Sequence, residues 1–82
     1  MLIALDYDKT YTADPMLWDS FIAQATERGH IVHIVTMRNH AGEAILDAPA
    51  PVIYTDRKAK HRFINADIWI DDSPHWILQD AA

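Results

Sequence analysis

The residues best suited to chemistry follow an apolar run at the start of the chain. Asp6 and Asp8 come directly after the run Leu2–Leu5, and Thr10 follows two residues later. Carboxylates beside a buried strand lose their hydration, which costs free energy unless a cation or hydrogen bonds compensate for it. A metal ion would supply that compensation, so this stretch predicts a metal site with chemistry at the strand end. Taken alone, the stretch is equally compatible with a polar turn.

Two later strands end in groups of a similar kind. The β-branched run at residues 30–36 ends at Thr36, and the strand expected at residues 67–70 precedes Asp71 and Asp72. The carboxyl ends of parallel strands meet at one edge of a sheet, where α/β proteins bind their ligands. We therefore expect this hydroxyl and these carboxylates to gather with the first acidic pair.

Helix and strand patterns alternate along the chain and predict its architecture. Asp14 and Pro15 are typical of a helix N-cap and first residue, and Gly29 of a C-terminal stop. Further helices are expected over residues 40–47, from Thr55 or Asp56 to about residue 65, and after Ser73-Pro74; strands are expected at Leu2–Leu5, 30–36, Val52–Tyr54 and 67–70. This alternation predicts one domain over residues 1–82, an α/β three-layer sandwich with a small parallel sheet of about four strands.

Composition narrows the class of protein. The 82 residues include no cysteine, which excludes disulfides and cysteine-based metal sites. A net charge of −5 argues against a broad electrostatic surface for nucleic acid. No apolar run approaches the roughly 18 residues of a membrane span, and the N-terminus lacks a secretory pattern. We expect a soluble, cytoplasmic protein that does not contact membranes.

Taken in order, the D-x-D-x-T stretch at residues 6–10, Thr36, a later lysine, and the pair Asp71 and Asp72 resemble the four motifs of the haloacid dehalogenase (HAD) superfamily. The resemblance covers nearly the whole chain. It implies a Rossmann-like core and a Mg²⁺-dependent phosphatase that hydrolyses a phosphate monoester through an aspartyl-phosphate intermediate. Elementary chemistry agrees, because a carboxylate can attack a phosphoryl group when a divalent cation offsets the repulsion between anions. A hard site with only oxygen ligands suits Mg²⁺.

Carried over by position, the resemblance implies a role for each motif residue. Asp6 would be the nucleophile and a metal ligand. Asp8 would be the general acid and base, with its backbone carbonyl on the metal. Thr36 would hold the phosphoryl oxygens. Asp72 would bind the metal directly, and Asp71 through a coordinated water molecule.

The motif lysine has two candidates, Lys58 and Lys60. The helix expected there would turn its apolar residues Phe63 and Ile64 toward the sheet. Lys60 precedes them by three and four positions and would share their face, whereas Lys58 would point largely away. The family motif also tends to place an apolar residue three positions after the lysine. We therefore expect Lys60 at the phosphoryl group, with Lys58 as the alternative.

Four further side chains are candidates for substrate contact. Arg38 stands two residues after Thr36, as in T-x-R sequences of the family, and Lys9 replaces the glycine common after the second aspartate. Lys58 belongs to a basic cluster, and His75 follows the acidic pair. For Arg38 and the basic cluster, the alternative is a solvated surface. Next to His75, Trp76 is expected in the core rather than at the site.

The short connections leave no room for the cap domain that nearly all relatives of this family insert. We therefore expect an open site that admits a bulky phosphorylated substrate or a phosphorylated macromolecule end, or one that a neighbour in a homo-oligomer covers. Two other functions are open at this point. One is a binding or regulatory module that holds a phosphoryl ligand without useful turnover, although Asp8 favours turnover. The other is a phosphotransferase with an acceptor other than water.

Overall fold

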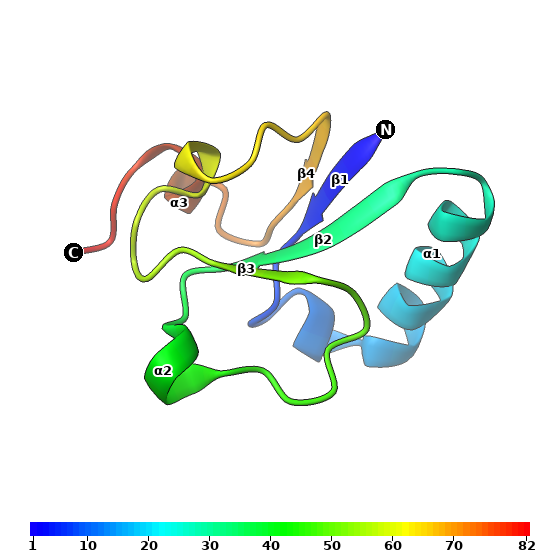
Figure 1. Cartoon of the computed structure of the whole chain (residues 1–82), viewed down its shortest axis with the longest axis horizontal. Coiled ribbons are helices and arrows are strands. Elements are labelled where there is room, and N and C mark those ends of the chain that lie inside the picture. The colour runs from blue at the N-terminus through cyan, green and yellow to red at the C-terminus, as the bar shows by residue number, and fades with distance from the viewer.

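The computed structural model describes all residues from 1 to 82. Its centre is a four-stranded sheet with the strand order β3-β2-β1-β4, and every neighbouring pair is parallel (Figure 1). The strands are β1 (Leu2–Leu5), β2 (Ile31–Thr36), β3 (Val52–Tyr54) and β4 (Ile68–Ile70). The predicted α/β sandwich with a small parallel sheet of four strands is confirmed. No helix is long and apolar enough to cross a membrane.

One face of the sheet packs against the long helix α1 (Pro15–Glu27). Ile3 and Leu5 of β1 join Ile22 and Ala25 of this helix in one buried cluster. The predicted helix start is confirmed, because the Asp14 carboxylate accepts a hydrogen bond from the backbone N–H of Leu17 at 3.3 Å. Gly29 takes a positive φ of 88°, as the predicted stop requires.

The opposite face has a thinner cover. Ala4 of β1 points to this side because successive strand residues alternate, and it clusters with Val35 and Ile64. The helix predicted to end near residue 65 is wrong: only a 3-10 turn, η2 (Lys60–Arg62), forms there. Asp56 and Arg57 have φ values of 50° and 66°, which a right-handed helix cannot contain. The chain therefore crosses this face largely as ordered loop.

Three smaller predictions also need correction. The helix expected over residues 40–47 ends early, as α2 (His40–Glu43), because Ala44 turns to an extended ψ of 142°. The last helix forms as α3 (His75–Leu78), but no side chain caps it. Ser73 instead donates its backbone N–H to the Asp71 carboxylate at 2.9 Å. The expected strands at 30–36 and 67–70 each begin one residue later than predicted.

Candidate functional site

Asp6 lies where β1 ends and is only 9% exposed. Its backbone N–H donates to the carbonyl of Ile70 at 2.9 Å, which continues the pairing of β1 with β4 by one residue. Its carboxylate accepts a hydrogen bond from the Thr10 hydroxyl at 2.9 Å and another from the Lys60 ammonium at 2.8 Å. Burial raises the pKa of Asp6 to about 6, although Lys60 works in the opposite direction. The side chain is thus a desolvated carboxylate that is ionised at neutral pH.

Lys60 is the cation of this buried cluster. Its side chain is 3% exposed and contacts both Asp6, at 2.8 Å, and Asp71, at 2.6 Å. Lys58 is exposed and does not line the cavity around these groups. The structure therefore brings Lys60 to the carboxylates, but not by the helix face on which the sequence prediction depended. Because η2 is a single turn, Phe63 does not share the buried face and is 46% exposed.

The acidic pair after β4 divides its contacts between two partners. Asp71 is nearly buried against Lys60, whereas Asp72 is exposed. The Thr10 hydroxyl also lies 3.0 Å from the Asp72 carboxylate, so Asp6 and Asp72 share its single proton, and the Thr10 oxygen accepts the backbone N–H of Asp72 at 3.1 Å. Hydrogen bonding, first with Asp6 and then with Thr10, lowers the pKa of Asp72. Thr10 therefore joins the loop after β1 to the loop after β4.

Three carboxylate oxygens, one each from Asp6, Asp71 and Asp72, lie within 4.8 Å of one another. Such a set of hard oxygen donors fits the chemistry of Mg²⁺. Lys60 pairs with both Asp6 and Asp71, so the exposed Asp72 is the carboxylate of this set that has no cation beside it. The Asp8 side chain is not in this group, which leaves only its backbone carbonyl for the metal contact expected of it.

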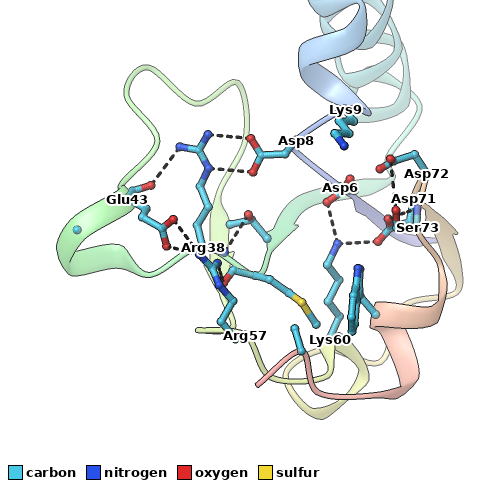
Figure 2. A pocket seen from close by; sticks show the side chains of 15 residues that line it. Asp6, Asp8, Lys9, Arg38, Glu43, Arg57, Lys60, Asp71, Asp72 and Ser73 are labelled. Carbon is cyan, nitrogen blue, oxygen red and sulfur yellow. Dashed lines mark hydrogen bonds and ion pairs between the residues drawn. The ribbon is translucent and has the colours of Figure 1, made fainter.

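Asp8 instead faces Arg38. The guanidinium donates two hydrogen bonds to the carboxylate, from Nε at 2.9 Å and from Nη2 at 2.8 Å (Figure 2). Arg38 lies over the ring of Tyr7, 5.0 Å from its centroid, and donates to the backbone carbonyl of Glu43 at 3.2 Å. The hydrogen bonds from Arg38 lower the pKa of Asp8 and raise that of Arg38. Arg38, predicted to bind substrate, is thus paired with Asp8, the predicted general acid.

The remaining predicted residues lie at different depths. Thr36 is 2% exposed and lines the cavity, where its Oγ1 accepts the backbone N–H of Arg38 at 3.2 Å. Lys9 lines the rim with a φ of 68°, a conformation that explains why glycine suits this position. His75 does not line the cavity. Its neighbour Trp76 does, so the expectation that Trp76 belongs to the core is wrong.

Sequence reasoning missed Arg57 and Glu43, which also line the cavity. In their ion pair, the Nη2 of Arg57 donates to both carboxylate oxygens of Glu43, at 3.1 and 2.9 Å. Arg57 comes three residues after β3, so the rule that parallel strands end at one edge could have found it. Nothing in the sequence alone distinguishes Glu43 from an ordinary helix-end acid.

These groups line an open cavity of about 690 Å³. Only three of its fifteen lining residues are hydrophobic. Figure 2 shows Asp6, Lys60 and the acidic pair on one side, Arg38, Arg57 and Glu43 on the other, and Asp8 between them. The arrangement suits a charged, hydrophilic ligand.

Comparisons of the chain with models of protein families, with curated proteins and with solved structures gave no match. The chemistry of the site itself is therefore the guide to its function.

Proposed function

We propose that the protein is a Mg²⁺-dependent phosphatase of the HAD type, which hydrolyses a phosphate monoester through an aspartyl-phosphate intermediate. The observation that carries the proposal is the buried Asp6 at the end of β1, held by Lys60 within a cluster of oxygen ligands. A cytoplasmic location and action without a membrane belong to the same proposal.

Asp6 has the properties of a nucleophile. Its raised pKa of about 6 still leaves it ionised at neutral pH, and burial removes the water that would weaken its attack. One carboxylate oxygen forms a bond to phosphorus while the bond from phosphorus to the ester oxygen breaks. Lys60 lies beside Asp6 and can also hold the phosphoryl oxygens, with the Thr36 hydroxyl at the floor of the same cavity.

Asp8 supplies the proton transfers in this proposal. It protonates the departing ester oxygen, then removes a proton from the water that attacks phosphorus and displaces the Asp6 oxygen. While Arg38 holds Asp8, the low pKa disfavours the protonated form that the first step needs. The reaction therefore requires Arg38 to exchange Asp8 for oxygens of the substrate.

Asp6 and Asp72 would hold Mg²⁺, with the backbone carbonyl of Asp8 as a further ligand and Asp71 acting through water. When bound, the ion offsets the repulsion between the Asp6 carboxylate and the phosphoryl oxygens. Lys60 contacts Asp6 and Asp71 alike, so the support for placing Asp72 next to the metal and Asp71 farther away is the exposure of Asp72 and the burial of Asp71.

A second candidate function is a module that binds a phosphoryl ligand without turnover. The observation in its favour is the same two-pronged hold of Arg38 on Asp8 at 2.8 and 2.9 Å, which leaves the acid unprotonated. If Arg38 keeps this contact when ligand binds, the site would retain the anion but not release its ester oxygen.

Burst kinetics with an activated aryl phosphate test the proposal. The wild type with Mg²⁺ should release the aryl alcohol steadily, and chelation of the metal should stop the release. Asp6→Asn should abolish turnover, whereas Asp47→Asn, which makes the same change in a loop away from the cavity, should not. Binding without any release would support the second candidate, and transfer to an added alcohol would indicate a phosphotransferase.

A further inference from the structure

The strongest backbone irregularity in the protein lies at the rim of the cavity. Asp56 and Arg57 are consecutive non-glycine residues with φ values of 50° and 66°. Each such conformation costs free energy and persists only where the surroundings enforce it. The enforcing contacts come from the segment after β2: the backbone N–H of Arg57 donates to the Met37 carbonyl at 2.9 Å, and that of Asp56 to the Arg38 carbonyl at 3.3 Å. The result is a guanidinium fixed at the cavity rim.

The Arg57 guanidinium is occupied by a carboxylate of the protein itself. Its Nη2 contacts both carboxylate oxygens of Glu43, at 3.1 and 2.9 Å, and its Nη1 donates to the Met37 carbonyl at 2.6 Å. The planar fork of an arginine matches a phosphate as well as it matches a carboxylate. Glu43 therefore stands where an anionic group of a ligand would bind.

Replacing Glu43 with an anionic group of a ligand costs little free energy. The side chains of Arg57 and Glu43 are 44% and 41% exposed, and exposed ion pairs contribute little free energy. The contacts of Lys60 with Asp6 and Asp71 differ in this respect, because they are buried, and Lys60 could leave only by separating from two carboxylates at once. The ion pairs on the Lys60 side of the cavity are therefore fixed, whereas Arg57 on the other side can exchange its anion.

The cavity also has room for a second contact. At about 690 Å³ it lies within the range of sites that bind whole small molecules, and one phosphoryl group beside Asp6 and Lys60 would leave much of it empty. The side opposite Lys60 carries Arg38 and Arg57, joined through Glu43 (Figure 2). In the proposed reaction Arg38 exchanges Asp8 for oxygens of the reacting phosphoryl group, so Arg57 is the remaining cation on this side that a second anionic group can bind.

We propose that Arg57 is a specificity-determining residue that binds a second phosphate group of the substrate, with Glu43 as the internal anion that this group displaces. The substrate class is then a phosphate monoester that carries another phosphate, either as a second monoester or as a diester. This inference deepens the proposed phosphatase function. It depends on that function for the conclusion that the ligand is a substrate, but the binding of the second phosphate by Arg57 does not.

The test measures binding by calorimetry in the Asp6→Asn background with Mg²⁺ present, where turnover cannot interfere. The probes share one nucleoside: the 5′-monophosphate, the 3′,5′-bisphosphate, and the 5′-phosphorylated dinucleotide, whose second phosphate is a diester. The bisphosphate should bind about tenfold more tightly than the monophosphate, as expected for one charge-assisted, two-pronged contact. Comparison with the dinucleotide tells which form of the second phosphate Arg57 takes.

Two substitutions should change this preference in opposite directions. Arg57→Gln should remove it, whereas Glu43→Gln should increase it severalfold, because the amide keeps the hydrogen bond from Asn39 but no longer competes as an anion. Arg62→Gln is the matched control: it removes one positive charge from the same loop, at a residue that does not line the cavity, and should change nothing.

If the protein bound the monophosphate as tightly as the bisphosphate and the dinucleotide, the inference would be overturned. So would a Glu43→Gln variant without an increased preference, or an Arg57→Gln variant that weakens all three probes equally. These outcomes are separate from failure of the phosphatase proposal. If the wild type prefers ligands with two phosphates but shows no turnover, the Arg57 contact stands and only the phosphatase proposal is refuted. If the wild type turns over substrate but shows no such preference, the phosphatase proposal stands and the role of Arg57 is refuted.

Discussion

Replacing Asp6 with asparagine should make the metal-free protein more stable at neutral and alkaline pH. Folding moves the Asp6 carboxylate from water to a site with 9% exposure, and this burial is the largest cause of its raised pKa. Lys60 at 2.8 Å compensates for only part of that cost. Asparagine has nearly the same shape and no charge, so it removes the desolvation penalty but can still accept a hydrogen bond from Lys60.

The magnitude follows from the pKa. The shift from 3.8 to about 6 is roughly two units, which corresponds to about 3 kcal/mol. Because the folded-state pKa is raised, the wild type is most stable, relative to the variant, below the ordinary pKa of aspartate. It loses that stability as the pH rises through about 6. The full advantage of Asp6→Asn should thus be present at about pH 8, and little of it at about pH 4.

Urea unfolding of both proteins in the presence of a chelator, at several pH values in this range, gives the difference directly. A gain of about 3 kcal/mol would raise the melting temperature by about 10 °C or more in a domain of this size. Asp47→Asn serves as the control, since Asp47 lies outside the cavity. A variant that is less stable than the wild type at about pH 8, or a difference that does not depend on pH, would show that pairing with Lys60 outweighs desolvation and would refute the reasoning.

Three further perturbations test other parts of the site. Lys60→Met should lower kcat/KM by about 10²–10³, whereas Lys58→Met should have little effect; a larger loss at Lys58 would reverse the assignment. Asp72→Ala should weaken Mg²⁺ binding, measured by calorimetric titration, more than Asp71→Ala does, and the opposite order would exchange their positions around the metal. Lys9→Gly should raise the free energy of unfolding by about 1 kcal/mol, because glycine relieves the strain of a φ of 68°; equal or lower stability in urea would show that this backbone is not strained.

The sheet and the gathering of its strand ends were predictable from the sequence. The apolar run Leu2–Leu5, the β-branched run ending at Thr36 and the residues before Asp71 have patterns that are typical of strands. Parallel strands connected in this order end at one edge, so Asp6, Thr36 and Asp71 had to lie near one another. Helix α1 was predictable for a similar reason, since its N-cap and its glycine stop are local signals.

The path of residues 55–65 was decided by the tertiary structure. Their composition suits a helix, but backbone contacts with the segment after β2 impose left-handed conformations on Asp56 and Arg57. The consequences are that Lys60 is buried and that Phe63 is exposed, an outcome that no helical periodicity describes.

The choice of ionic partners was decided in the same way. A sequence shows which residues carry charge, but a carboxylate pairs with whichever cation the fold places within reach. Asp8 meets Arg38, thirty positions away in the chain, and Asp6 meets Lys60, fifty-four positions away. Local patterns are enough for strands and caps because their hydrogen bonds join near neighbours or follow regular ladders. Contacts between distant side chains depend on the whole packed structure, and it is these contacts that set the charge and the pKa of each group in the cavity.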